Sequence, residues 1–376
     1  MDEMRVALVH DWLVDFGGAE SVVEALVETF LPKDIHTLFY DPENFASSPI
    51  SKCRIHTTFL DTKWARRRYR KLLPLFPFAV ERLKITDCDV VISSSHCVAH
   101  GVKTNPGQLH ICYCHTPIRY AWDMMDEYLA LSGMASGPKS WLAKAALSYI
   151  RRWDRRVSSR ARYYVSNSNF IASRIKNCWG KEAVTIYPPC GVEPLEEGTP
   201  KGGHFIFASR LVQYKRADLV VEAAGKIGAP VRIAGGGPQL AELQKTAPDN
   251  VTFLGHLPKD ELRREIASAR ALIFPALEDF GILPVEAQAL GTPVIAYGRG
   301  GALETVVPPA GEDYSSATGI FFDSQDADSV AGAVRKFERI EKNFRREAMT
   351  ENAKRFSKER FVREISEFVA SRREDR

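Results

Sequence analysis

The chain has 376 residues, about twice the length of a typical domain, so two domains with separate cores are expected. Its shares of apolar residues (45%) and charged residues (26%) are ordinary for soluble globular proteins. No apolar run approaches the roughly 20 residues that span a membrane, Met1 to Arg5 lead directly into an apolar strand rather than a secretory signal, and the seven cysteines show no paired spacing. From these features we expect neither a membrane-spanning nor a disulfide-stapled secreted protein, but a cytoplasmic chain with reduced thiols.

The first half of the chain alternates apolar strands with helical patterns. Val6–His10 forms the first expected strand, and the adjacent glycines Gly17 and Gly18 precede a helical pattern that runs through Phe30. This pair lacks the GxGxxG spacing of a dinucleotide site, so it either makes a tight structural turn or turns bare backbone toward a ligand. The alternation predicts a parallel sheet with helices on both faces. Further strands are expected at 35–39, 90–93, 111–114 and 163–166.

Polar residues flank two of these strands. His115 directly follows the strand at 111–114, at the carboxyl edge where parallel sheets bind ligands, and it is either a ligand-binding residue or a satisfied structural histidine. Asp87 and Asp89 form a DxD pattern, which elsewhere binds metal and diphosphate, but they precede their strand and so lie at the opposite edge. We interpret this acidic pair as structural and expect no metal site.

Two stretches, 63–78 and 140–162, mix basic with aromatic residues. The net charge of +4 is distributed unevenly along the chain, since residues 1–190, which contain both stretches, carry +6 and the remainder −2. The mixture favours the surface of an anionic membrane, although the solvated faces of core helices have a similar composition. Nucleic acid would attract the same charges, but there is no nucleic-acid motif and the second half is slightly acidic, so no nucleic-acid partner is expected.

The stretch 187–203 is rich in proline and glycine, and we expect it to be a linker and hinge between a first domain at 1–186 and a second at 204–356. The last helical pattern, at 357–376, has an apolar stripe, and we expect it to cross back to the first domain. Strands recur in the second half at 205–208, 231–234, 251–254, 272–275, 294–296 and 319–322, most of them followed by a helical pattern, which predicts a second doubly wound domain.

Charged residues follow two strands of the second domain. Arg210 and Lys215 come after the first strand, where a planar guanidinium and a mobile ammonium suit phosphate oxygens. Glu278 follows the strand at 272–275, on the same carboxyl edge of the sheet. The edge therefore combines two cations with a carboxylate.

The segment from Glu278 onward has the order loop, then helix. Pro284 suits the first helical position, which would put Glu286 in the first turn, and Gly281 lets the backbone approach a ligand closely. Carboxylates repel phosphate but accept hydrogen bonds from hydroxyls, so two acids beside an anion site indicate a sugar nucleotide. Alternatively, Glu278 is a solvated loop acid and Glu286 only suits the helix dipole.

These motifs resemble those of the retaining glycosyltransferases of family 4, which have the GT-B fold. The resemblance covers nearly the whole chain and rests on the GTPVIA segment at 291–296, the GG-x-x-E turn at 300–304, and the residues Gly17, Gly18, Arg210, Lys215, Glu278 and Glu286. The segment HTPIRYAWDMMDEYL at 115–129 resembles a narrower subgroup, the mannosyltransferases of O-antigen and exopolysaccharide assembly.

The resemblance implies two Rossmann-like domains that face each other across a cleft, with the donor mostly on the second domain and the acceptor on the first. Arg210 and Lys215 would hold the donor diphosphate, Glu286 the ribose and Glu278 the transferred sugar. In the first domain, His115 would lie near the transferred sugar. The backbone of Phe280, Gly281, Ile282 and Leu283 would flank sugar and phosphate, and that of Gly17 and Gly18 would approach the diphosphate.

The resemblance further implies a metal-independent enzyme without a cofactor, whose co-substrate is a sugar nucleotide. We expect it to move a hexose, mannose from GDP-mannose, onto a lipid-linked or oligosaccharide acceptor in surface polysaccharide assembly, peripherally at the inner face of the cell membrane. Two alternatives stay open: another two-Rossmann sugar-nucleotide enzyme, such as a non-hydrolysing epimerase, which needs no acceptor, and a catalytically silent partner protein with the same fold.

Overall fold

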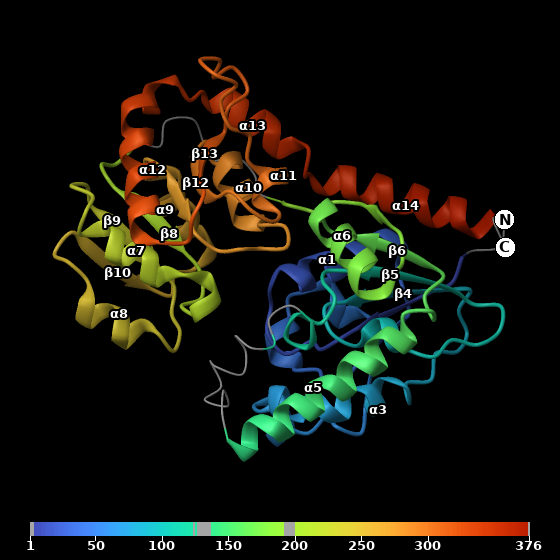
Figure 1. Cartoon of the computed structure of the whole chain (residues 1–376). Helices are drawn as coiled ribbons and strands as arrows, with labels where there is room; N and C mark the ends of the chain where they lie inside the picture. The colour runs from blue at the N-terminus through green and yellow to red at the C-terminus, as the bar shows by residue number, and fades with distance from the viewer. Residues whose placement is uncertain (1–3, 123–124, 126–136, 192–199, 375–376) are drawn as a thin grey trace. The chain divides into compact units, whose positions relative to one another are not determined.

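A computed structural model describes residues 4–122, 125, 137–191 and 200–374. The chain divides into two compact units, of which the first comprises Met1–Pro189 and Lys358–Arg376 and the second Cys190–Ser357 (Figure 1). The division falls inside the stretch 187–203 that the sequence marks as a linker, and residues 192–199 of that stretch lie outside the described residues. Each unit is described by itself.

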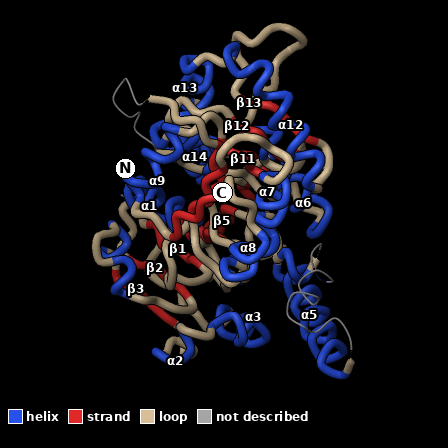
Figure 2. The backbone as a smooth tube through the Cα atoms, turned by 90° about the vertical axis from the view of Figure 1, so that its left-hand side faces the viewer, coloured by secondary structure: helices blue, strands red, loops and turns tan. Residues whose placement is uncertain are grey.

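The first unit is built on a seven-stranded parallel sheet with the order β3-β2-β1-β4-β5-β6-β7. The central strands β1, β4 and β5 are buried along their whole length, as expected where helices cover both faces of a parallel sheet. Figure 2 shows β1, β2 and β3 side by side. The strands are β1 (Val6–His10), β2 (Asp34–Thr37), β3 (Arg54–Thr57), β4 (Val90–Ser95), β5 (Leu109–Cys114), β6 (Tyr163–Ser166) and β7 (Ala183–Thr185).

Two layers of helices cover this sheet. One face packs against α1 (Gly18–Phe30) and α14 (Lys358–Glu374), so the last helix of the chain returns to the first unit. The other face packs against α5 (Pro138–Val157) and α6 (Asn169–Trp179), together with α3 (Phe76–Val80). The shorter elements are η1 (Pro42–Phe45), η2 (Pro49–Lys52), α2 (Lys63–Arg66), η3 (Tyr69–Leu75), η4 (Ala99–Gly101) and η5 (Arg119–Ala121).

The second unit repeats this architecture with a six-stranded parallel sheet, ordered β10-β9-β8-β11-β12-β13. Its strands are β8 (Phe205–Ala208), β9 (Val231–Ala234), β10 (Val251–Gly255), β11 (Leu272–Phe274), β12 (Val294–Tyr297) and β13 (Gly319–Phe322). One face packs against α7 (Ala217–Ala224), α8 (Leu240–Thr246) and α12 (Ala327–Ile340), and the other against α9 (Lys259–Ser268), α10 (Ile282–Ala289) and α11 (Ala302–Thr305). The remaining elements are η6 (Gln213–Lys215), η7 (Glu341–Asn343) and α13 (Arg346–Lys354).

The expectation of two doubly wound α/β domains is confirmed, with two differences in detail. The sequence missed the edge strands β3 and β7, whose residues are mostly half-exposed or exposed and therefore lack the apolar signature of a buried strand. The position of Pro284 was predicted wrongly, because α10 begins at Ile282 and Pro284 is its third residue. Glu286 therefore lies in the second turn, not the first. The proline is tolerated there because the N–H groups at the start of a helix have no intrahelical partner.

In the described part of the chain, we find no helix with the length and hydrophobicity needed to cross a bilayer.

Candidate active site

In the second unit, Lys215 and Glu278 meet at the carboxyl edge of the sheet. Lys215 ends η6, which follows β8, and Glu278 lies in the loop between β11 and α10. The Lys215 Nζ donates a hydrogen bond to Oε1 of Glu278, and the two side chains are only 22% and 15% exposed. Partial burial strengthens the attraction between the two charges and holds both groups in one place. Two residues that lie 63 positions apart in sequence thus form one ion pair.

Arg210 lies in the loop after β8 and is exposed. Among the described residues it has no salt-bridge or hydrogen-bond partner for its guanidinium, so the fork of donors is available to an anion on the same edge as Lys215.

Glycine turns hold these loops against each other. The loop after β9 passes so close to the loop after β8 that a Cβ on Gly235 would lie 1.9 Å from the carbonyl oxygen of Ser209. A Cβ on Gly301, in the turn after β12, would lie 2.3 Å from Cα of Phe280. The amide of Gly301 also donates to the carbonyl oxygen of Glu278 at 2.9 Å. Only glycine permits such an approach of two backbones, so these turns fix the loop that carries the carboxylate.

The start of α10 has the geometry of an anion site. Gly281 is its N-cap residue with a φ of +90°, in the left-handed region that favours glycine. Ile282 and Leu283 are the first two helical residues, so their N–H groups have no partner inside the helix. Phe280 is buried, and its ring packs edge-on against Phe356 with centroids 5.4 Å apart. The residues 280–283 therefore lie next to Glu278 at the start of α10.

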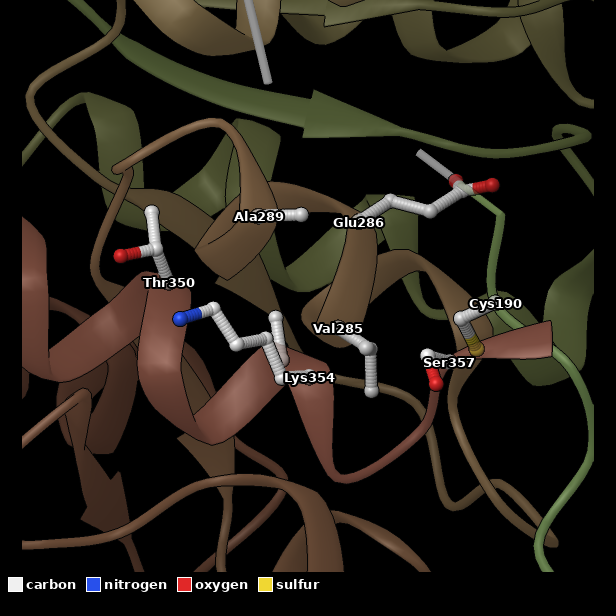
Figure 3. Close-up of a pocket in the computed structure, with 8 residues that line it drawn as sticks. Cys190, Val285, Glu286, Ala289, Thr350, Lys354 and Ser357 are labelled. Carbon is white, nitrogen blue, oxygen red and sulfur yellow. The ribbon is translucent and has the colours of Figure 1, made fainter. Parts of the chain in front are cut away.

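Glu286, in the second turn of α10, lines a pocket of about 230 Å³. Burial raises the pKa of its carboxyl, while Lys259 and Arg263 act in the opposite direction. Figure 3 shows the carboxylate directed away from the ammonium of Lys354, which pairs with Glu351 at 2.7 Å. The pocket is lined by Cys190, Val285, Glu286, Ala289, Thr350, Ala353, Lys354 and Ser357.

In the first unit, Gly17, Gly18 and His115 lie at the carboxyl edge of the sheet. Gly17 is the N-cap residue of α1, and Gly18 is the first residue of the helix. The glycine pair thus forms the junction between the loop after β1 and α1. His115 follows β5 and is buried. Its Nε2 lies 2.8 Å from the hydroxyl oxygen of Ser94, the fifth residue of β4. These three residues belong to one unit and the remaining site residues to the other.

The sequence missed a polar cluster that surrounds His115. His10 ends β1, Glu20 lies in the first turn of α1, and the rings of His10 and His96 have their centroids 5.5 Å apart. Burial opposes protonation of His10, but the hydrogen bond and charge of Glu20 outweigh it and raise its pKa. Burial, with the positive charges of His96 and His10, lowers the pKa of His115 well below its ordinary value.

Asp11 anchors the loop that carries His96. Its two carboxylate oxygens accept four backbone hydrogen bonds of 2.5 to 2.9 Å, from the amides of residues 96 to 99. The signal was present in the sequence, since Asp11 directly follows the first strand as His115 follows the fifth. In the described ranges, no group of three or more His, Cys, Asp or Glu side chains is arranged to hold a metal ion.

Two family models together match most of the chain. The model described as Glycosyltransferase Family 4 matches residues 16–194, and that described as Glycosyl transferases group 1 matches residues 197–356. Among curated proteins, a GDP-mannose-dependent alpha-(1-6)-phosphatidylinositol monomannoside mannosyltransferase of Mycobacterium tuberculosis is 33% identical over 199 residues, which cover 44% of this chain and 50% of the relative. A 2-deoxystreptamine glucosyltransferase of Streptomyces kanamyceticus is 34% identical over 133 residues, 31% of this chain and 34% of that protein. The match thus spans about half the length of the first relative, or less for the second.

Solved structures match the fold over nearly the whole chain. A sucrose-phosphate synthase from Thermosynechococcus elongatus has a TM-score of 0.73 at 19% identity and covers 99% of this chain and 100% of its own. HepE from Anabaena, solved in complex with UDP, has a TM-score of 0.70 at 14% identity and covers 98% and 100%. At such low identity the likeness shows the fold alone, which is GT-B.

Proposed function

Because this chain belongs to glycosyltransferase family 4, we propose that it transfers a hexose from a sugar nucleotide, and that the donor is GDP-mannose. The observation that carries the proposal is the contact between Lys215 and Glu278. The resemblance assigns Lys215 to the diphosphate and Glu278 to the transferred sugar. These two donor groups are joined by the glycosidic C1–O bond, so the side chains that bind them must be neighbours, as they are here.

The reaction proposed is a displacement at C1 of the sugar. The bond from C1 to the phosphate oxygen breaks, an oxocarbenium-like centre develops, and negative charge collects on the leaving nucleoside diphosphate. The acceptor hydroxyl oxygen then bonds to C1 on the same face, and its proton passes to the leaving phosphate. Lys215, held by Glu278, and the N–H groups at the start of α10 are fixed positive elements at the same sheet edge, and they stabilise that charge without reorganisation. Arg210 adds an exposed guanidinium on this edge. They fill the role of a divalent cation, so we propose a metal-independent enzyme. Retention of the anomeric configuration is part of the proposal.

Glu278 and Glu286 accept hydroxyl hydrogens on the two sides of the diphosphate. In this proposal Glu278, which Lys215 holds, binds the sugar, and Glu286, which lines the pocket of Figure 3, binds the ribose. A carboxylate that is half-buried next to apolar side chains is costly to desolvate, and hydroxyl donors satisfy it. The guanine and the mannose rest on the names of the GDP-mannose-dependent relatives.

Donor binding tests this assignment first. We expect GDP and GDP-mannose to raise the melting temperature more than UDP, ADP and their sugar conjugates, since a ligand at 100 times its dissociation constant adds about 2.7 kcal/mol to folding stability. A transfer assay with labelled GDP-mannose and a lipid extract follows, with NMR of the product to read the anomeric configuration. Donor turnover without any acceptor requirement would favour an epimerase, and nucleotide binding without turnover a silent partner.

The acceptor proposed is a lipid-linked glycan at an anionic membrane surface. The stretches 63–78 and 140–162 pack on the same face of the first sheet, through η3, α3 and α5. Large apolar side chains project from them: Trp141 and Leu142 are 78% and 69% exposed, and Trp64 is 61% exposed. Exposed apolar side chains among arginines and lysines suit a headgroup region, where each nearby cation contributes about 1 kcal/mol. We propose that the enzyme works peripherally at the inner face of the cell membrane.

Sedimentation with vesicles checks this surface. We expect binding to vesicles that contain phosphatidylglycerol, weaker binding as salt rises, and little binding to pure phosphatidylcholine. The double variant Trp141→Ser, Leu142→Ser should reduce binding. The matched control is Leu31→Ser, since Leu31 is also 78% exposed but ends α1 on the opposite face of the sheet. Equal loss in both variants would contradict the assignment of this face.

A further inference from the structure

Three consecutive serines of β4 each contact a histidine. The hydroxyl oxygen of Ser93 lies 2.8 Å from Nε2 of His110, and that of Ser95 lies 3.1 Å from Nδ1 of His100. Between them, the hydroxyl oxygen of Ser94 lies 2.8 Å from Nε2 of His115. Because side chains alternate along a strand, Ser94 faces the opposite side of the sheet from its two neighbours.

Ser94 links His115 to a second histidine and an acid. Nδ1 of His10 lies 3.0 Å from the carbonyl oxygen of Ser94 and 3.1 Å from its hydroxyl oxygen. Nε2 of His10 lies 3.3 Å from Oε1 of Glu20. All four side chains are buried. The result is a continuous chain of contacts in the order Glu20, His10, Ser94, His115.

The acceptors in this chain decide where the protons are. A carbonyl oxygen and a carboxylate only accept, so both ring nitrogens of His10 carry a proton, and His10 and Glu20 form a buried ion pair. The hydroxyl of Ser94 then receives the His10 donor on one side and must direct its own hydrogen elsewhere. The position left for that hydrogen is Nε2 of His115. Nε2 is therefore an acceptor, and the single ring proton of His115 lies on Nδ1.

Nδ1 of His115 is the opposite edge of the ring, and no described residue forms a hydrogen bond with it. The residue as a whole keeps 8% of its surface exposed. The other charged or titratable groups around the chain are Asp11, which holds the His96 loop, His96 itself, Arg70, and Tyr113, whose ring packs edge-on against that of His115 with centroids 5.2 Å apart. None of them bonds to the His115 ring.

We propose that Glu20, His10 and Ser94 are positioning residues that hold the proton of His115 on Nδ1, so that His115 meets the donor sugar as a hydrogen-bond donor. The arrangement of the protons stands on the contacts alone, whereas its use in catalysis rests on the proposed function. Histidine in water prefers the other tautomer, with the proton on Nε2, so the chain of contacts imposes the minor form.

NMR of the ring nitrogens tests the arrangement without any substrate. In protein labelled with ¹⁵N-histidine, the His115 signals are identified by their loss in His115→Asn. We expect a protonated Nδ1 and an unprotonated Nε2 in the unaltered protein. In Ser94→Ala the signals should move toward the Nε2-protonated form, and Glu20→Gln should shift them in the same direction. An Nε2-protonated His115 in the unaltered protein would overturn the proposal, whatever the variants do.

Ser93→Ala is the matched control. It removes a buried hydroxyl from the same strand, and with it a serine–histidine contact of the same 2.8 Å length, but on the other face of the sheet. We expect its His115 signals to match those of the unaltered protein. A purely structural role for Ser94 predicts instead that the two alanine variants leave the tautomer equally unchanged.

Kinetics then ask whether the tautomer matters for transfer. We expect Ser94→Ala to lower kcat about ten- to a hundredfold with a smaller change in KM, since misplacement of a reacting group typically costs about a hundredfold. Ser94→Thr keeps the hydroxyl and should restore much of the rate. If GDP-mannose is not the donor, the NMR result still stands. If transfer proceeds normally in Ser94→Ala although its tautomer has changed, the positioning role is refuted and the proposed function survives.

Discussion

Replacement of Lys215 by alanine separates the structural role of the Lys215–Glu278 pair from its chemical role. Both side chains are mostly buried, at 22% and 15% exposure, so the variant leaves the carboxylate of Glu278 without this cation. Exposed ion pairs contribute about 0 to 1 kcal/mol and the loss of one partner of a buried pair costs about 3–5 kcal/mol. For this intermediate burial we expect a loss of about 1–2 kcal/mol, which lowers the melting temperature of a domain of this size by about 2–8 °C.

The expected loss of activity is much larger. Removal of one fixed positive element that faces the leaving group typically costs about 10²- to 10³-fold in rate. The assay is initial-rate transfer from GDP-mannose well below the melting temperature, so that the folded fraction is the same in all samples. Lys226→Ala is the control, because Lys226 pairs with Asp328 at 2.8 Å on the surface of the same unit, with exposures of 39% and 83%. It should keep full activity.

The two roles give different outcomes. If Lys215→Ala loses stability as expected but transfers at a rate within about twofold of the unaltered protein, the pair is structural and the assignment of Lys215 to the diphosphate is refuted. If both fall, Lys215→Arg should recover part of the rate, because it keeps the positive charge.

Gly301→Ala should weaken nucleotide binding and lower stability, because the new Cβ would lie 2.3 Å from Cα of Phe280 and one of the two backbones must move. Titration with GDP checks this prediction. Unchanged affinity would show that the close approach of the two loops does not matter for binding. The free energy of unfolding should fall as the pH drops below about 6.5, the ordinary pKa of histidine in an unfolded chain. Burial lowers the pKa of His36 to about 4 and that of His110 to about 3, so the unfolded chain binds more protons than the folded chain. The slope that each residue contributes therefore approaches about 1.4 kcal/mol per pH unit as the pH falls toward 5. Denaturant titrations between pH 7 and 5 would show a flat profile if these residues were not held neutral. The Nζ of Lys201 lies within hydrogen-bond distance of the carbonyl oxygens of Ala267, Ala269 and Gly291 and the hydroxyl of Thr292. Lys201→Met should destabilise the second unit by about 1–3 kcal/mol, because these backbone and side-chain acceptors would lose their donor. A thermal melt equal to that of the unaltered protein would contradict this prediction.

Much of the fold was predictable because its signals are local. The apolar runs at 6–10, 163–166, 205–208 and 319–322 coincide with β1, β6, β8 and β13. Each of these strands is a short apolar run that is buried on both faces, and exposed segments do not have this pattern. The helical patterns between the strands require them to pair in parallel. The edge strand β3 (Arg54–Thr57) has no such run, since its residues are exposed or half-buried, and only its pairing with β2 defines it.

The start of α10 shows where local signals fall short. Pro284 suits the first position of a helix, yet Gly281, with its φ of +90°, makes the turn that starts the helix at Ile282. Three successive positions tolerate a proline equally, because none of their N–H groups has a partner within the helix. The dihedral angle that chooses among them depends on how the loop packs against the turn at Gly301.

The sequence by itself determined that Arg210, Lys215, Glu278 and His115 follow strands and so lie at the carboxyl edges of two parallel sheets, because the direction of a strand is a local property. Only the tertiary structure decided which side chains touch. Lys215 contacts Glu278, which lies 63 residues away in the sequence. Glu20, at the start of α1, is linked to His115 through His10, at the end of β1, and Ser94, near the end of β4. Such contacts depend on the packing of whole elements against each other, and neither spacing nor composition encodes the few tenths of an ångström that separate a hydrogen bond from a near miss.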